Sequence, residues 1–385
     1  MSTPIITQIR AIPVNIPYRT TPVMSAGASA YSSRTVIIVE TSEGLRGIGE
    51  AAYGFPAQII EHELAPALVG LDALDLALLR RHCLPDVLDF GTPSLRTRLA
   101  AWGGVELALW DLLGKFSELP LYRLLGGACR KQAPFSCYAY AEPGTTDPVE
   151  SMAKRAEADL EASGSSIFEF KVGVYPVEVE IEVVKAVHEA VGGRAQIAVD
   201  ANMGMAFDTA RRFLREVAPF LENFEEPVPH LAQMARLARE FNISVSTHCS
   251  DLDAVLAHPE IDIVPTLDVC GGVSQVRRIS ETVSALGRRV WLRSHAESGI
   301  GWAAMVHLGM SLRPLERPAQ ALIDSLEDDL VIGERWSVRH GGVRPPERPG
   351  LGVELDWDAV QRYHERYQKM GDVQAFPPTP DRERR

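Results

Sequence analysis

The stretch SIFEFKVG (166–173) sets the pattern of this chain, because a short apolar run ends there in a polar side chain, Lys171. The same pattern recurs three times. The later polar residues and their runs are Asp200 in AQIAVDAN (195–202), Glu225 in ENFEEP (222–227) and His248 in NISVSTH (242–248). The steps between the four residues are 29, 25 and 23 residues, the length of one strand–helix unit with its loops. In a (β/α)₈ barrel consecutive strand ends face one mouth, so the spacing predicts that these side chains converge there.

The bulk composition excludes several classes of protein. The chain has 385 residues, 46% of them apolar, and a net charge of −12, which argues against nucleic acid or an anionic membrane as partner. No apolar run is long enough to span a bilayer, and the N-terminus lacks the basic-then-apolar pattern of a signal peptide. Five cysteines without CxxC spacing favour a reduced environment. We therefore expect a cytoplasmic protein.

The first third of the chain predicts an α+β domain. Residues 4–15 and 34–41 have the β-branched content of strands, and SEGLRGIGE (42–50) predicts a turn followed by a further strand. From about 57 to 126 the apolar spacing becomes helical, most clearly in RTRLAAWGGVELALWDLLGK (96–115). We assign residues 1–128 to an α+β capping domain. Its long polar loop, about 16–33, is either a functional lid, which we expect to set substrate specificity, or simply mobile.

Strand-like and helix-like runs alternate from residue 132 onward. The predicted strands are 134–141, 166–171, 195–200, 221–225, 243–248, 261–266, 289–295 and 320–324. Eight such units favour a parallel α/β barrel over residues 129–330, although periodicity separates a barrel poorly from an open sheet. Residues 331–385 are expected to return to the cap and to end in a disordered tail, FPPTPDRERR (376–385).

Seven short motifs carry a resemblance to a known family. They are GIGE (47–50), VELALWDLLGK (105–115), FKVG (170–173), VDAN (199–202), FEEP (224–227), CGGVSQ (270–275) and SHAESGIG (294–301). In this order and spacing they resemble the enolase superfamily, in its mandelate racemase and sugar-acid dehydratase branch. The resemblance implies an α/β fold, a modified (β/α)₈ TIM barrel with an α+β capping domain. It also implies Mg²⁺ and the removal of a proton next to a carboxylate. AAMVHLGMSL (303–312) and LIDSLEDDL (322–330) look most like the glucarate dehydratase group.

The resemblance places three metal ligands. Asp200, Glu225 and His248 fit the ligand positions, and a metal there would stabilise the charge of an enediolate. Carboxylates suit Mg²⁺. His248 departs from the acidic residue or amide of most members, and imidazole shifts the preference toward Mn²⁺ or another divalent ion.

Lys171 occupies the position where the family has a KxK pair, and the resemblance implies that it is the base. The first member of the pair is Glu169 here. Strand alternation points both side chains the same way. Three roles are open to Glu169: holding the Lys171 ammonium, orienting substrate, or raising the pKa of the lysine.

His295 matches the family histidine on the opposite face of the site, where it would protonate a leaving hydroxyl or act as a second base. In the family an aspartate orients this histidine. Thr266 stands at the expected place, and Asp268 follows two residues later. Either the His–Asp pair is missing or Asp268 substitutes in it.

Five further residues are candidates for auxiliary roles. Asn202 and Glu226 would support the metal or contact substrate, and Asp324 would orient the distal substrate or His295. Tyr18 and Arg19 flank the predicted specificity loop and are candidates for recognising the far end of the substrate.

These expectations lead to one function and two alternatives. We expect a metal-dependent dehydratase of a sugar acid, an aldarate such as glucarate or galactarate or else an aldonate. The first alternative is a racemase, epimerase or cycloisomerase that uses the same enediolate. The second is a non-catalytic binder of sugar acids, which the departures at Glu169, His248 and Thr266 would produce. The partner is a small carboxylate, and the family implies a homo-oligomer, from dimer to octamer.

Overall fold

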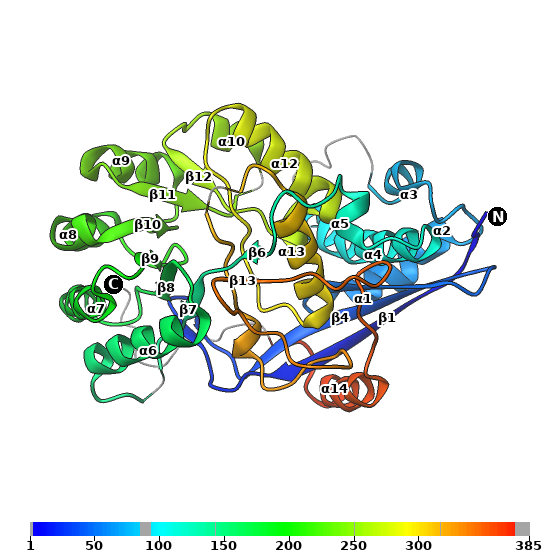
Figure 1. Ribbon diagram of the computed structural model, residues 1–385, viewed down its shortest axis with the longest axis horizontal. Coiled ribbons are helices and arrows are strands. Elements are labelled where there is room, and N and C mark those ends of the chain that lie inside the picture. Colours follow the sequence, from blue (N-terminus) through cyan, green and yellow to red (C-terminus); the bar gives the residue numbers. More distant parts are fainter. Residues whose placement is uncertain (1–2, 85–93, 143, 250, 316, 374–385) are drawn as a thin grey trace.

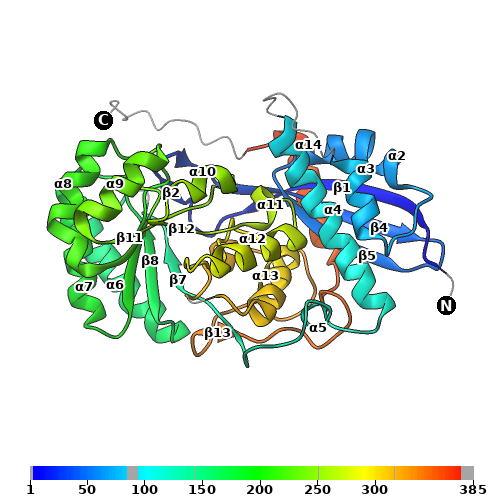
Figure 2. The same ribbon diagram turned by 90° about the horizontal axis from the view of Figure 1, so that it is seen from above.

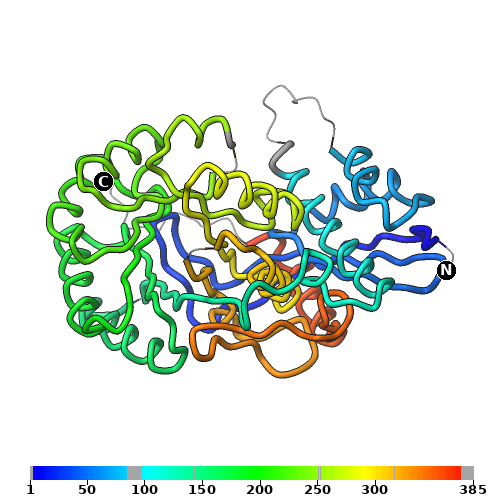
Figure 3. Tube along the Cα trace, turned by 45° about the horizontal axis from the view of Figure 1, so that its top comes forward, coloured from blue at the N-terminus to red at the C-terminus, as the bar shows by residue number. Residues whose placement is uncertain are grey.

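The computed structural model describes residues 3–84, 94–142, 144–249, 251–315 and 317–373. An α+β cap lies at one end of the molecule and a parallel barrel at the other (Figures 1 and 2). Figure 3 follows the chain from the cap through the barrel and back to the cap. Among the described residues no helix has the length and apolar character needed to cross a membrane.

A three-stranded antiparallel sheet forms the base of the cap. Its strands, in the order β1-β4-β5, are β1 (Ile6–Pro17), β4 (Tyr31–Thr41) and β5 (Arg46–Ala52). The predicted strands and turn are confirmed. The loop between β1 and β4 contains a two-residue hairpin, β2 (Val23–Met24) with β3 (Gly27–Ala28).

The cap also contains helices, of which α4 (Ser94–Phe116) packs on the sheet. They are α1 (Pro56–Ile59), η1 (Ile60–Leu64), α2 (Ala65–Leu68), α3 (Leu76–Cys83), α4 (Ser94–Phe116) and α5 (Leu121–Leu124). Helix α4 packs against β5 so closely that the GIGE motif needs its glycines. A Cβ at Gly47 would lie 2.0 Å from the carbonyl oxygen of Ala108, and one at Gly49 would lie 2.1 Å from that of Gly104.

Six parallel strands form the regular part of the barrel. They are β7 (Cys137–Ala139), β8 (Ile167–Lys171), β9 (Gln196–Asp200), β10 (Leu221–Glu225), β11 (Ser244–Thr247) and β12 (Ile261–Ile263), hydrogen-bonded in chain order. Every residue of β8 is buried, as expected for a parallel strand with packed side chains on both faces. The predicted strands over this part of the chain are confirmed in order, and most are shorter than expected.

Helices lie outside these strands (Figure 2). They are α6 (Pro148–Ser163), α7 (Val177–Val191), α8 (Phe207–Val217) with η2 (Ala218–Phe220), α9 (Leu231–Phe241) and α10 (Leu252–Leu256). Their apolar residues recur at helical spacing and face the strands. In α8, for example, Ala210, Phe213, Leu214 and Val217 are buried.

The last two strand positions are irregular, unlike the predicted strands 289–295 and 320–324. Single parallel bridges join Val290 to Ile263 and to Leu315, and another joins Phe135 to Ala319. Pro314 and Pro318 lack the backbone N–H that a continuous ladder requires, which explains the interruption of the eighth strand. The segment after it forms the turn η3 (Ile323–Ser325). The ring is therefore closed by isolated contacts.

The helices of this half are α11 (Leu267–Cys270), α12 (Val273–Ala285) and α13 (Gly299–Ser311). The chain then returns to the cap. Strand β13 (Gly342–Val343) pairs with β6 (Ala133–Pro134), and α14 (Trp357–Met370) lies along β1 (Figure 1). The predicted tail, 376–385, lies outside the described residues, and the predicted division at 128 and 330 stays a prediction.

We expect Asp111→Ala to destabilise the protein strongly. The buried carboxylate of Asp111 accepts hydrogen bonds from the backbone N–H groups of Ile48 (2.9 Å) and Leu351 (2.7 Å), so it joins α4, β5 and the returning segment. Leaving both donors without a partner should cost about 3 kcal/mol, measured by thermal or urea unfolding. The exposed Glu150, paired with Lys154, gives the control: Glu150→Ala should change stability by less than about 0.5 kcal/mol. Equal effects of the two substitutions would contradict the assignment.

His307 should make stability depend on pH. It is fully buried in α13, accepts from the N–H of Tyr122 (3.3 Å) and lies 3.1 Å from the carbonyl oxygen of Leu351, and burial lowers its pKa to about 4. Because this pKa lies below the unfolded value of about 6.5, its contribution is present above pH 6.5 and is lost as the pH falls toward 4. We expect a loss of about 2 kcal/mol by pH 5. His307→Gln keeps both hydrogen bonds without titrating, and should reduce the acid destabilisation in urea unfolding at pH 7.5 and 5; an unchanged pH dependence would contradict this origin.

Candidate active site

Strand register brings the predicted residues to one end of the barrel. Lys171 pairs with Asp200 across β8 and β9, and Asp200 pairs with Glu225 across β9 and β10. Parallel strands in register present these positions at the same height. The spacing in the sequence thus corresponds to a physical cluster at the carboxyl ends of the strands.

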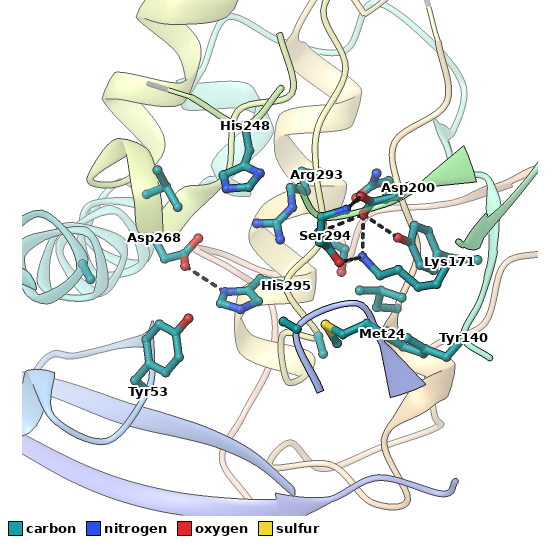
Figure 4. A pocket seen from close by; sticks show the side chains of 18 of the residues that line it. Met24, Tyr53, Tyr140, Lys171, Asp200, His248, Asp268, Arg293, Ser294 and His295 are labelled. Atoms are coloured by element: carbon teal, nitrogen blue, oxygen red, sulfur yellow. Dashed lines mark hydrogen bonds and ion pairs between the residues drawn. The ribbon is translucent and has the colours of Figure 1, made fainter. Parts of the chain in front are cut away.

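A cavity of about 470 Å³ lies at this end, between the barrel and the cap. The cap contributes Tyr18, Met24, Tyr53 and Phe55 to its wall. The polar barrel residues of the wall are Tyr138, Tyr140, Lys171, Asp200, Asn202, His248, Asp268, Arg293, Ser294, His295 and Gln320 (Figure 4).

Lys171 is fixed on one side of the cavity. Its Nζ donates to Asp200 Oδ2 at 2.5 Å and to the side-chain oxygen of Asn202, and it lies 5.4 Å from the ring centre of Tyr138. Asp200 also accepts from the Tyr138 hydroxyl (2.9 Å) and the Asn202 N–H (2.7 Å). Burial acts to raise the pKa of Asp200, but the Lys171 ammonium and these donors hold it below its ordinary value.

Glu169 lies beneath Lys171, inside the barrel. Its carboxylate accepts from Arg317 (3.1 Å) and Gln320 (2.7 Å), so among the described contacts it is held by these two residues. Gln320 donates also to Glu225, at 2.6 Å. Burial, and then the nearby Asp200, raise the pKa of Glu169 despite Arg317. Of the three roles open to Glu169, holding the ammonium has no contact here to support it.

Each of the three predicted metal ligands lies next to another charged side chain. Asp200 is bound by Lys171, and Glu225 Oε1, a buried atom without a hydrogen bond, lies 3.6 Å from Nε of Arg293. Nδ1 of His248 lies 2.8 Å from Oε1 of Glu226, without the alignment of a hydrogen bond. Within the described ranges no three His, Cys, Asp or Glu side chains are arranged to hold a metal ion. In this arrangement Asp200, Glu225 and His248 do not fit a divalent cation. Their assignment as metal ligands stays a prediction.

Buried charge explains the pKa directions around these ligands. Burial, followed by the like charges of Asp200 and Glu169, raises the pKa of Glu225 well above its ordinary value. Burial and the nearby Arg293 lower the pKa of His248. Glu226 accepts from Thr247 Oγ1 at 2.9 Å, and its Oε2 is buried without a hydrogen bond.

His295 and Asp268 form a pair on the other side of the cavity. Nδ1 of His295 lies 2.8 Å from Oδ2 of Asp268 (Figure 4). Thr266, at the position expected from the family, is buried and precedes α11. The alternative in which Asp268 substitutes is therefore the one that the geometry matches. Burial acts to raise the pKa of Asp268, but His295, Arg293 and Arg34 lower it well below its ordinary value.

The cap holds the backbone of this histidine. Arg34 of β4 donates from Nη1 to the carbonyl oxygen of His295 at 3.1 Å and pairs at 2.5 Å with Glu50, the last residue of the GIGE motif. Glu50 also accepts from the N–H groups of Ser298 (3.1 Å) and Gly301 (3.2 Å), at the start of α13. The buried pair thus fixes the loop that carries His295.

The remaining sequence candidates divide between two cavities. Tyr18 lines the first cavity, whereas Arg19 and Asp324 line a second one, of about 410 Å³, beside α6 and the returning segment. Asp324 is therefore not placed next to His295. The cause is η3, whose turn takes the residue out of the barrel strand.

Sequence reasoning missed Arg293, Arg317 and Gln320, which supply the polar contacts to the buried carboxylates. Arg293 and His295 are two residues apart, so strand alternation could have placed both at the cavity. Arg317 and Gln320 lie in a proline-interrupted segment that has no strand pattern. No periodicity could have found them.

Two family models match consecutive parts of the chain. Residues 6–126 match the model described as "Mandelate racemase / muconate lactonizing enzyme, N-terminal domain". Residues 151–359 match the model described as "Enolase C-terminal domain-like".

Curated relatives carry more than one activity. A "Probable glucarate dehydratase" of Streptomyces coelicolor is 27% identical, over 88% of this chain and 86% of the relative. An "Arabinonate dehydratase" of Saccharolobus solfataricus is 29% identical, over 84% and 89%. A "Chloromuconate cycloisomerase" of Cupriavidus necator is 26% identical, over 91% and 96%.

Two solved structures share this fold over nearly their whole length. An enolase from Thermobispora bispora, complexed with magnesium and formate, is 27% identical with a TM-score of 0.85, covering 96% of this chain and 95% of its own. An enolase from Mycobacterium smegmatis, complexed with tartrate, is 26% identical with a TM-score of 0.87, covering 96% and 94%.

Proposed function

Because this chain belongs to the mandelate racemase/muconate lactonizing enzyme family of the enolase superfamily, we propose that it dehydrates a sugar acid. The substrate is an aldarate such as glucarate or galactarate, or else an aldonate. The observation that carries the proposal is the pair of proton-transfer groups, Lys171 and His295 with Asp268, that line one cavity. Two of the relatives bear the names of sugar-acid dehydratases.

Lys171 is the base in this proposal. For this step the ammonium beside Asp200 first releases a proton to solvent; the resulting amine takes the proton from the carbon next to the substrate carboxylate, and the electrons of the C–H bond move into the enediolate. Asp200 and Asn202 contact the same nitrogen, so they fix its position in the cavity. Positioning of this kind keeps a base within reach of a weakly acidic proton.

His295 is the acid. Its Nδ1 is bound to Asp268, so the other ring nitrogen, Nε2, is the one that can donate to substrate. The enediolate electrons expel the β-hydroxyl, the C–O bond breaks, and the proton from Nε2 leaves with it as water. The resulting enol takes up a proton at the β-carbon and becomes a 2-keto-3-deoxy acid.

The family resemblance implies Mg²⁺, with Mn²⁺ or another divalent ion as the option that His248 favours. Magnesium is present in the Thermobispora relative. In this chain Asp200, Glu225 and His248 do not face a common point, so no step of the proposal passes through a metal. The homo-oligomer that the family implies also stays a prediction.

Epimerisation or cycloisomerisation is the second candidate, and the cycloisomerase relative favours it. Lys171 and His295 would then act as two bases on opposite faces of one carbon. Deuterium from solvent would enter the α-carbon without loss of water. A cavity that bound acid sugars with no exchange of the α-proton would instead support the non-catalytic alternative.

We expect Lys171→Ala and His295→Asn to separate the two proton transfers. The assay is a library of aldonates and aldarates, with keto-acid formation and deuterium exchange at the α-carbon as readouts. In Lys171→Ala the rates of keto-acid formation and of deuterium exchange should both fall by about 10³-fold. In His295→Asn keto-acid formation should be lost while deuterium exchange continues. Lys185→Ala, on the exposed face of α7, is the control. If wild type makes no keto acid from any library member, the dehydratase proposal fails.

Asp268→Asn tests the orientation of His295. We expect kcat to fall by about 10²-fold or more with little change in KM, because the amide cannot stabilise the imidazolium and selects another tautomer. Thr266→Ala, at the position that the family pattern singles out, should leave kcat within about twofold because the Thr266 hydroxyl makes no hydrogen bond to the ring. The reverse order of effects would show that Asp268 is not the orienting residue.

A further inference from the structure

Arg293 is a charged side chain of the cavity wall that neither the sequence motifs nor the proposed reaction uses. It precedes His295 by two residues, and its backbone N–H donates to the carbonyl oxygen of Pro265 at 3.1 Å. Its side chain is 13% exposed and lines the cavity. Figure 4 shows the guanidinium directed toward the space between His248 and Asp268. It therefore lies inside the candidate active site.

The carboxylates around Arg293 are those from which a metal site would be built. Nε lies 3.6 Å from Glu225 Oε1, the buried oxygen that has no hydrogen bond. Glu225, Asp268, Glu226 and Asp200 all attract the guanidinium. A buried carboxylate needs a partner of opposite charge, and Arg293 supplies it for Glu225 as Lys171 does for Asp200.

A divalent ion at Glu225 would meet two obstacles. The first is repulsion from the guanidinium, which buried surroundings screen only weakly. The second is geometric, since among the described residues no three His, Cys, Asp or Glu side chains are arranged to hold a metal ion. Both obstacles come from side chains that are present, and both act against metal binding.

The same guanidinium suits the substrate. Arginine presents parallel N–H donors that match a carboxylate in a bidentate pair, and it remains charged at any working pH. A fixed positive charge beside the carboxylate stabilises the negative charge that grows on it when the α-proton leaves. In the family a metal is expected to supply this charge.

We propose that Arg293 is the built-in cation of this site: it binds the substrate carboxylate and takes the place of a divalent ion at Glu225. The inference rests on the proposed function for the class of substrate, a small carboxylate. It concerns binding, so it can be tested without turnover.

The first test measures metal binding. Apo protein is titrated with MnCl₂, following free Mn²⁺ by electron paramagnetic resonance, and with MgCl₂ by calorimetry. We expect wild type to bind either ion weakly, and Arg293→Gln to bind Mn²⁺ at least tenfold more tightly because the repulsion is gone. Arg289→Gln is the matched control: Arg289 pairs with Glu222 (2.7 Å) and Asp262 (3.0 Å) away from the cavity. Tight binding of one Mn²⁺ by wild type, unchanged or weakened in Arg293→Gln, would overturn the proposal.

The second test measures carboxylate binding with tartrate, the ligand named for the Mycobacterium relative. Wild type should bind tartrate equally in EDTA and in Mg²⁺, and Arg293→Gln should weaken binding in EDTA at least tenfold. Arg293→Lys, which keeps the charge and loses the planar fork, should fall between them. If wild type binds tartrate only with Mg²⁺, or not at all, Arg293 does not replace the metal. Failure of the keto-acid assay leaves these binding results valid, so the two proposals fail separately.

Discussion

Lys171, Asp200 and Glu225 stand side by side because three parallel strands pair in register at their carboxyl ends. This register forces like charges together in a buried place, which is costly unless opposite charges meet them. Other buried polar side chains supply partners for these carboxylates. Gln320 joins Glu169 to Glu225, and Arg317 pairs with Glu169.

The cap has a different role, which is to hold the loop that carries His295, the proposed acid. Arg34 and Glu50 form a buried pair on neighbouring strands of its sheet, and their outer contacts go to the backbone of His295 and to the first turn of α13. The geometry of proton transfer thus depends on both domains. Moving the cap sheet would move His295 relative to Lys171, and with it the distance over which the two groups act on one substrate.

The fold and half of the candidate site could be predicted from the sequence. Apolar runs ending in Lys171, Asp200 and Glu225 specify both the strands and the direction in which these side chains point, so one pattern carries both facts. The choice between Thr266 and Asp268 could not be made, because a short helix, α11, begins at Leu267 and carries Asp268 in its first turn. Arg293, Arg317 and Gln320 contact residues that are far away in the sequence. A periodic pattern along the chain does not show which distant residues meet in space.

The irregular seventh and eighth strands have a consequence for how the ring is held together. A regular strand is fastened by a ladder of backbone bonds, which does not depend on side-chain identity. Here backbone hydrogen bonds are made at single positions, such as Ala319 N–H to the carbonyl oxygen of Pro134 (3.0 Å) and Gln320 N–H to that of Leu292 (3.0 Å). The side chains of Arg317 and Gln320 add contacts to the buried glutamates on β8 and β10. Replacing Arg317 would therefore change the packing of this segment and the charge of the barrel interior in a single step, so architecture and chemistry are linked at this place in the fold.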